Sequence, residues 1–600
     1  MPFRHLSNIL LLILILPVII GAGGVCNAQG SGIPILGAEE LRAGMKGYGK
    51  TVFSGERIDT FDVEVLGVLK NWQAKSDMIL VKMSGAPLDN TGIISGMSGS
   101  PVYIDDKIIG AVSYGWSFAK EAIAGVTPIK DMLNVMNLNI NEAEKGLEPA
   151  QVPWQSPLFL QEPALKETMA GRGNTESHTL NLIPIGTPLV ISGFDQRIVR
   201  DMSLALERYG LFPVQGGNMS ELDDVVTELV PGSAVAAILA SGDINASAVG
   251  TVTYRDGKNI LAFGHPFIQS GKTDMPMAGA YVYAVLPSQS TSLKIAAPTK
   301  IVGRISQDRK TALAGNIGEF ARMIPCLISV KGAQDVEYNF DVVDDRYLTQ
   351  TLVQWATENA LLATERQTGD KTVRLRLSLY TNCMERPIKI ENTMYEPHPT
   401  WFPVYYITQP IASIMNNNFK AVKIEKIALE AEVTSERKVA QIQNIRIDKR
   451  YVKPDDTVKL TVTMKPFGQE SVTKIISVHI PPDTAPGSNV IISVCNSDIS
   501  QALERSRAPD LFNPSSLEHL VNLLESTESN TNLIVRASIP KRGVTFKGQR
   551  LPSLPSSLLT VMSFSNQSGV SRLTDEMVYR EPVEWILAGF EMLSLFVEKE

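Results

Sequence analysis

Hydrophobic and polar residues alternate in short runs along most of the chain, and turn residues separate the runs. Phe61, Val63 and Val65 alternate with polar neighbours, as a half-buried strand requires. The same alternation recurs at residues 427–433 and 458–464, with a polar turn at residues 452–456 between them. Many short strands bounded by turns predict a mainly β protein.

The length of the chain requires several domains, since 600 residues are too many for one hydrophobic core. A proline-rich stretch at residues 139–180 has the composition of a linker between two β-rich segments. We expect the following units: a signal peptide (1–28), a half carrying a serine motif (33–138), the linker (139–180), a half carrying a histidine (181–330), an α+β region (331–420), a β-sandwich module (421–500) and a C-terminal α+β region (501–600).

The N-terminus has the pattern of an export signal. Arg4 precedes an apolar run at residues 9–20, and small residues follow up to Ala28. Cleavage after Ala28 would leave a chain without a membrane span, in the periplasm, the cell envelope or outside the cell. An uncleaved membrane anchor is the alternative, although Pro17 interrupts the run.

Charge and cysteine usage exclude several classes of function. The net charge is −7, and no basic stripe is present, so no nucleic acid partner is expected. Removal of the signal leaves Cys326, Cys383 and Cys495, which allow one disulfide at most and form no zinc motif. We therefore expect no metal and no cofactor.

The segment Gly96-Met-Ser-Gly-Ser-Pro101 carries the strongest chemical signal. Glycines allow a sharp bend at Ser98, so that the Gly96 and Ser98 amides could form an oxyanion hole beside a nucleophilic hydroxyl. A hairpin should follow, with strands at 101–104 and 108–115 around a turn at 105–107. In chymotrypsin-like folds the end of such a returning strand pairs with the substrate backbone; here these residues are Val112, Ser113, Tyr114 and Gly115. An ordinary Gly/Ser-rich hairpin is the alternative.

A serine nucleophile needs a base, and His265 is the best candidate among six histidines. It follows a predicted strand and lies between Gly264 and Pro266, which restrict the backbone. A lone histidine is more often structural, so the assignment depends on its pairing with Ser98.

Together these segments resemble the sporulation protein IV B serine peptidase family. The resemblance lies in residues 49–55, 61–65, 91–101, 125–133 and 250–265, with Gly303, Gly315 and Asn316. It implies a trypsin-like double β-barrel with Ser98 as nucleophile and His265 as base.

Two departures from the family pattern stand out. Ser98 precedes His265 by 167 positions, so the serine and histidine segments are permuted. Triads occur in several chain orders, and order alone does not exclude catalysis. No acid occupies the family's usual place, which leaves Asp89 and Asp274 as candidates to orient the imidazole.

The sequence thus predicts an exported serine endopeptidase that cleaves protein or peptide substrates in the cell envelope. The alternative is a non-catalytic envelope scaffold or peptide-binding protein that retains the barrel. An esterase using Ser98 is a third class, but no strand–elbow–helix pattern of an α/β-hydrolase supports it.

Overall fold

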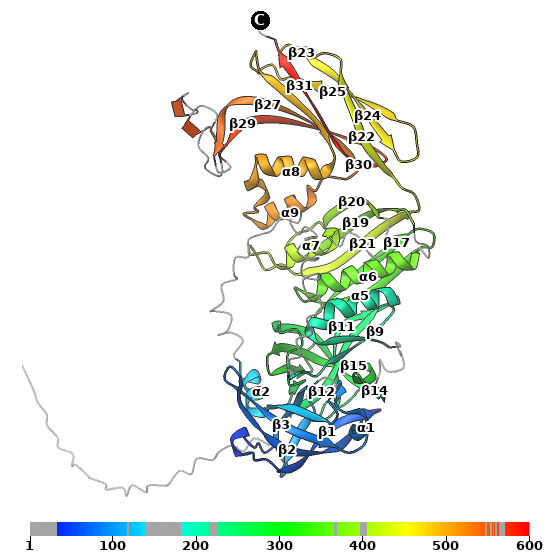
Figure 1. Ribbon diagram of the computed structural model, residues 1–600, viewed down its shortest axis with the longest axis vertical. Coiled ribbons are helices and arrows are strands. Elements are labelled where there is room, and N and C mark those ends of the chain that lie inside the picture. The colour runs from blue at the N-terminus through cyan, green and yellow to red at the C-terminus, as the bar shows by residue number, and fades with distance from the viewer. Residues whose placement is uncertain are drawn as a thin grey trace, which may run out of the picture.

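The computed structural model describes residues 33–116, 119–138, 182–216, 225–364, 369–396, 405–546 and, with gaps, 549–598. The predicted signal peptide and linker fall outside these residues. The chain is elongated, with its N-terminal strands at one end and its C-terminus at the other (Figure 1). Strands dominate, which confirms the predicted mainly β class.

Six antiparallel strands form a first closed barrel, because β5 pairs with β6 as well as with β1. Phe61, Val63 and Val65 point into it, while Asp62 and Glu64 are exposed, as the alternation predicted. In barrel order the strands are β1 (Lys46–Ser54), β2 (Arg57–Gln73), β3 (Ser76–Ser84), β7 (Ile123–Pro128), β6 (Lys107–Gly115) and β5 (Pro101–Ile104).

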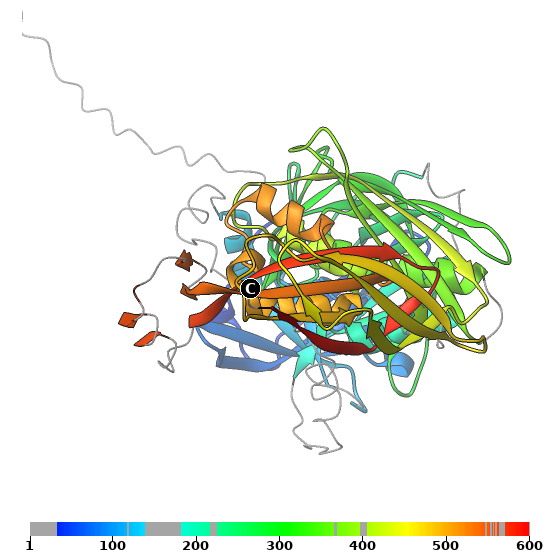
Figure 2. The same ribbon diagram turned by 90° about the horizontal axis from the view of Figure 1, so that it is seen from above.

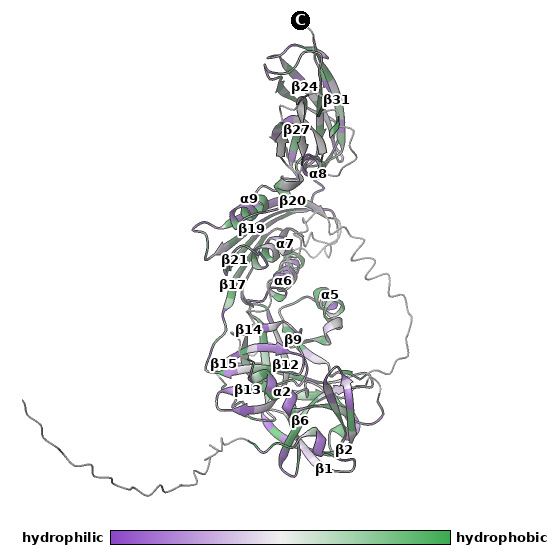
Figure 3. Cartoon of the chain, turned by 90° about the vertical axis from the view of Figure 1, so that its left-hand side faces the viewer, coloured by the Kyte–Doolittle hydropathy of each residue, from purple (hydrophilic) through white to green (hydrophobic). Residues whose placement is uncertain are grey.

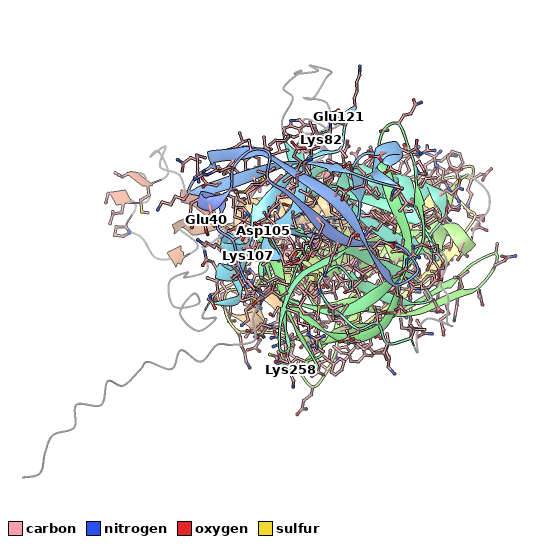
Figure 4. All side chains as sticks on the ribbon, turned by 90° about the horizontal axis from the view of Figure 1, so that it is seen from below. Glu40, Lys82, Asp105, Lys107, Glu121 and Lys258 are labelled. Carbon is pink, nitrogen blue, oxygen red and sulfur yellow. The ribbon has the colours of Figure 1, made fainter. Side chains whose placement is uncertain are left out.

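The predicted hairpin after the serine motif is formed by β5 and β6. Asp105 and Asp106 both have positive φ, as a two-residue hairpin turn of this kind requires. Figure 4 shows Asp105 and Lys107 side by side at this turn, whereas Lys258, at the β12–β13 turn, lies on the opposite side of this view from Lys82.

A second closed antiparallel barrel follows, because β11 pairs with both β12 and β14. Outside it, β9 (Thr187–Ser192) pairs with β12 and with β10 (Leu211–Gln215), and α5 (Gln196–Leu206) connects β9 to β10. The barrel strands are β12 (Asn245–Asp256), β13 (Asn259–Ala262), β16 (Ala312–Ile317), β15 (Ser292–Arg309), β14 (Gly271–Leu286) and β11 (Ala234–Gly242).

The two barrels pack against each other through buried apolar side chains. One shared cluster joins Tyr103 and Ile108, with α2 (Ile129–Met136), to Tyr254 and Leu261 of the second barrel. A short strand, β4 (Ile94–Ser95), leaves the serine segment and pairs in parallel with β15. Burial of this interface holds the serine and histidine segments together.

Beyond the second barrel the sheet continues through β18 and β17 to β21, β19 and β20. Helices α6 and α7 lie on one face of these strands (Figure 3). The strands and helices are β17 (Met323–Lys331), β18 (Val336–Val343), α6 (Leu348–Thr364), β19 (Lys371–Thr381), β20 (Ile388–Glu396), α7 (Tyr405–Met415) and β21 (Ile424–Thr434).

The predicted β-sandwich module at 421–500 needs a correction at both ends. Strand β21 pairs with β17 and β19 and so belongs to the preceding sheet, although its alternation is indistinguishable from that of a sandwich strand. The two sheets that share the last apolar core also require strands beyond residue 500. Figure 2 shows these C-terminal strands from above, with β31 in red.

The first sheet of this C-terminal unit contains β22 (Val439–Ile447), β24 (Thr457–Pro466), β25 (Val472–His479) and β30 (Ile586–Ala588). The second contains β23 (Tyr451–Val452), β26 (Asn489–Cys495), β27 (Asn532–Phe546), β28 (Gln549–Leu551), β29 (Val570–Pro582) and β31 (Phe590–Val597). Helices α8 (Ser497–Arg507) and α9 (Leu517–Glu525) lie between β26 and β27 in the chain. Within the described residues, no helix has the length and apolar character needed to cross a bilayer.

Candidate active site

Ser98 lies in a tight turn between β4 and β5, beside Val112 of β6. The Gly99 amide donates to the Val112 carbonyl at 2.8 Å, and the Ser100 hydroxyl donates to the Met97 carbonyl at 2.6 Å. Gly99 has a φ of +97°, and a Cβ there would lie 2.0 Å from the Thr251 oxygen, so only glycine fits. The Ser98 side chain is fully buried, and its Oγ makes no hydrogen bond with any residue that the structure describes.

The second barrel holds this turn in place through β12. The Thr251 amide donates to the Ser98 carbonyl at 2.9 Å, and the Thr251 hydroxyl donates to the Gly96 carbonyl at 3.2 Å. Thr253 Oγ1 donates to the Gly99 carbonyl at 2.7 Å. None of these bonds uses the Ser98 amide, which the sequence predicts to be an oxyanion donor.

His265 follows β13 on a strained segment of backbone. Phe263 and Gly264 have φ values of +69° and +72°, and positive φ is costly for a bulky residue such as phenylalanine. His265 Nδ1 lies 2.8 Å from the Pro266 carbonyl oxygen. Because a carbonyl oxygen can only accept, Nδ1 carries the proton and Nε2 keeps a free lone pair.

Burial keeps this imidazole neutral. It lowers the pKa of His265 to about 4, against the smaller opposing effect of the hydrogen bond to Pro266. A neutral ring with a bare Nε2 is the form that can accept a proton from a serine hydroxyl. Within the described part of the chain, Nε2 itself has no hydrogen-bond partner.

The structure brings the serine and histidine segments together. A Cβ on Gly99 would lie 2.5 Å from the Phe263 nitrogen, and a Cβ on Gly264 would lie 2.9 Å from Ser113 Cβ. Thr127 Oγ1 in β7 donates to the Gly264 carbonyl at 2.7 Å. Since Ser98 Oγ and His265 Nε2 both lack partners, the hydrogen bond between them is not formed in this conformation.

Neither predicted acid is hydrogen-bonded to His265. Asp89 accepts a hydrogen bond from the Gly85 amide at 3.0 Å, within its own turn. Asp274 accepts from Arg304 and from the Arg322 amide. The two candidates therefore hold local structure elsewhere, and the Pro266 carbonyl orients the imidazole.

A buried acid without a sequence signal, Asp308, fixes the loop after His265. Its carboxylate accepts hydrogen bonds at 2.9–3.0 Å from the backbone amides of Phe267, Ile268 and Ser270. The residue lies inside the long strand β15, where no motif distinguishes it from other polar strand positions.

Lys294 is a second residue without a sequence signal. It is fully buried in β15, and its stem packs beside Gly96, where a Cβ would lie 3.4 Å from Lys294 Cδ. Burial lowers the pKa of Lys294 to about 7. This buried lysine therefore supports the turn that carries Ser98.

The predicted substrate-binding residues of β6 have different neighbours. Val112 bonds with the serine turn at both its amide and its carbonyl. The edge formed by Ser113, Tyr114 and Gly115 is covered by residues 183–185 of the same chain. Next to this edge is a cavity of about 730 Å³ with a largely apolar lining, which includes Ser95, Trp116, Ile185, Phe212 and Pro266.

No group of three or more potential metal ligands occurs among the residues that the structure describes. Cys326, Cys383 and Cys495 are free thiols. Burial raises the pKa of Cys495 to about 11, so this thiol is not a reactive thiolate at neutral pH.

Comparison with known proteins supports the resemblance for the serine segment. Residues 26–133 match the family described as SpoIVB peptidase S55, which confirms the resemblance inferred from the motifs. The matched range contains Ser98 and the β6 edge but ends before His265. No curated protein and no solved structure matches the chain.

Proposed function

We propose that this chain is a serine endopeptidase in which Ser98 is the nucleophile and His265 the general base. One observation carries the proposal: two barrels bring a buried serine turn and a neutral histidine together. Among the described residues, neither Ser98 Oγ nor His265 Nε2 has a hydrogen-bond partner. The match of residues 26–133 to a serine peptidase family supports the same chemistry.

In this mechanism the Ser98 hydroxyl rotates toward His265 Nε2, a movement that requires no existing hydrogen bond to break. Nε2 takes the hydroxyl proton while Oγ bonds to the substrate carbonyl carbon. The Gly96 and Ser98 amides stabilise the negative oxygen. His265 then returns the proton to the amine nitrogen as the C–N bond breaks, and water later releases the acyl group from Ser98.

A non-catalytic, peptide-binding barrel is the second candidate function. The complete burial of Ser98 and the absence of its hydrogen bond to His265 favour this second function, because the serine of a peptidase must be accessible to the substrate. The two functions make opposite predictions for reaction of the serine with an electrophile.

We also propose that the protein acts outside the cytoplasm, since the N-terminal pattern is that of an export signal. N-terminal sequencing of the protein from its native cell should then start near Gln29. An intact Met1 on a cytoplasmic protein would contradict export.

A serine-directed fluorophosphonate probe tests the enzymatic proposal on the full chain. We expect labelling that maps to Ser98, is lost in Ser98→Ala and falls sharply in His265→Gln. Hydrolysis of a peptide library should follow the same order of variants. Absence of labelling at Ser98 under all conditions would favour the binding barrel.

A further inference from the structure

A short strand of the chain itself lies along the β6 edge beside Ser98. In β8 (Ile183–Pro184), Ile183 is paired with Gly115 and Pro184 with Tyr114, in antiparallel register. The next amide, that of Ile185, donates to the Ser113 carbonyl at 2.8 Å. These pairings are the ones expected between this edge and the acyl side of a bound peptide, that is, the residues on the N-terminal side of the bond to be cleaved.

The side chains of this segment alternate as those of an extended ligand would. Ile185 is 6% exposed and belongs to the apolar core of the first barrel, a cluster that also contains Met97 of the serine turn and Val112 of β6. Ile183, two residues earlier, is 46% exposed. One aliphatic side chain thus enters the apolar core that contains Met97, the residue before Ser98, and the other is partly exposed to solvent.

The residue after Ile185 also fits this arrangement. A Cβ on Gly186 would lie 3.1 Å from Ser95 Oγ and 2.3 Å from the Phe212 ring, so this position has no room for a side chain. The chain then enters β9, and the Thr187 amide donates to the Gly210 carbonyl. Residues 183–186 therefore pass from one barrel to the other across the serine turn.

We propose that residues 183–185 are an internal pseudosubstrate that occupies the acyl-side subsites of the peptidase. The inference rests on the function proposed above and adds its substrate class. The site takes an extended peptide whose aliphatic side chain enters the place of Ile185, followed by a small residue in the place of Gly186.

The covering strand is suited to removal. It pairs over only two residues, one of which is a proline that has no amide hydrogen to donate. A substrate can replace it only if the segment leaves the edge, so the full chain should react slowly until that happens.

The rate of fluorophosphonate labelling at Ser98 tests this proposal in the full chain. Ile185→Gly removes the buried side chain, and Ile185→Pro keeps an apolar side chain but removes the amide that donates to Ser113. We expect both variants to label at least tenfold faster than the wild type. Ile183→Ala, which changes only an exposed side chain of the same strand, should stay within about twofold of the wild type.

The peptide aldehyde acetyl-Leu-Ile-Pro-Ile-H, which copies residues 182–185, provides the specificity measurement. It should block labelling of Ile185→Gly at concentrations at least tenfold lower than those needed for the wild type. An analogue ending in Asp should not block labelling, because the site is apolar.

The outcomes separate the two proposals. Equal labelling rates in the wild type and in both folded Ile185 variants would overturn the pseudosubstrate and leave the peptidase intact. Labelling in none of the proteins would overturn the peptidase itself. Circular dichroism checks that each variant is folded; if Ile185→Gly is not, Ile185→Pro decides the question.

Discussion

Lys294 and Thr51 join the two barrels through a buried hydrogen bond. Lys294 Nζ in β15 donates to Thr51 Oγ1 in β1 at 2.9 Å, and both side chains are fully buried. A neutral hydroxyl compensates only part of the desolvation of an ammonium group, which explains why burial lowers the pKa of Lys294 to about 7.

This pair predicts a pH-dependent effect of Lys294→Met on stability. Lysine in the unfolded chain has a pKa near 10.4, so between about pH 7 and pH 10 the unfolded state binds more protons, and the free energy of unfolding rises with pH. Below pH 7 the lysine is charged in both states and bears the full cost of burial. Lys294→Met should be more stable than the wild type there, by on the order of a few kcal/mol.

Urea denaturation at pH 6 and pH 9.5 measures this effect, and the advantage of the variant should shrink at the higher pH. Thr51→Val, which leaves the ammonium without its acceptor, should be less stable than the wild type at pH 6 by about 1–3 kcal/mol. Parallel pH–stability curves for the wild type and Lys294→Met would contradict a depressed lysine pKa.

Ser98→Ala and Ser100→Ala should separate chemistry from structure. Loss of Ser98 should reduce peptidase activity by on the order of 10⁴-fold or more. Thermal stability should be nearly unchanged, because its hydroxyl makes no hydrogen bond. Ser100→Ala loses the bond to Met97 that closes the turn, so it should lower the melting temperature and reduce activity much less. Equal losses of activity would indicate a damaged turn in both variants.

The pH dependence of the labelling rate should reflect the protonation of the buried His265 imidazole. Since the pKa of His265 is about 4, the ring stays neutral well below the ordinary histidine range. The labelling rate of Ser98 should be constant from pH 8 to about pH 5 and fall near pH 4. The free energy of unfolding should also decrease as the pH falls from about 6.5 to about 4. In this range the unfolded histidine takes up a proton, whereas the folded one stays neutral. A rate midpoint near pH 6.5 would mean that the reactive form exposes the ring to water.

Asp308→Asn should act through the position of the histidine loop. An amide oxygen can accept fewer of the three backbone hydrogen bonds and carries no charge, so the loop at residues 267–270 should loosen. We expect the labelling rate to fall about 10- to 100-fold because the histidine loses its position, and the pH midpoint to stay unchanged. Asp89→Asn, at an exposed turn where the carboxylate accepts a hydrogen bond from the Gly85 amide, is the matched control and should label like the wild type.

Cutting the chain between the barrels should leave them associated. A protease recognition sequence inserted between residues 139 and 180 allows a single cut between Ser98 and His265. The fragments should co-elute in gel filtration, since the interface buries an apolar cluster and includes the β4–β15 pairing. Separation of the fragments without denaturant would show that the covalent connection, rather than packing, maintains the site.

Sequence patterns predicted the local elements well. Alternation at Phe61 to Val65 identified a strand, and the Asp105-Asp106 turn identified a hairpin, because both depend on neighbours within a few residues. The proximity of the Ser98 and His265 segments was also predicted. That prediction came from the resemblance to a serine peptidase family and not from the spacing of the two residues along the chain.

Long-range pairings set the rest of the site, and no local pattern encodes them. From the sequence, Lys294 would be taken for an ordinary exposed lysine in an apolar run. Its burial depends on Thr51, 243 positions away, which accepts its hydrogen bond. Asp308 gains its role only from the loop that folds over it. Strand β21 alternates like a sandwich strand, yet its partners β17 and β19 precede it in the middle sheet.

The order of Ser98 and His265 along the chain has a consequence for biosynthesis. Ser98 leaves the ribosome 167 residues before His265. At translation rates of roughly 5–20 residues per second, that interval lasts about 8–33 seconds. Throughout it the nascent chain carries an unactivated serine, so under the proposed mechanism it has no hydrolytic capacity until the second barrel is synthesised and closes around the turn. A trypsin-like chain in the usual order makes its base first and completes its site with the serine. Under the proposed mechanism this chain completes its site with the histidine.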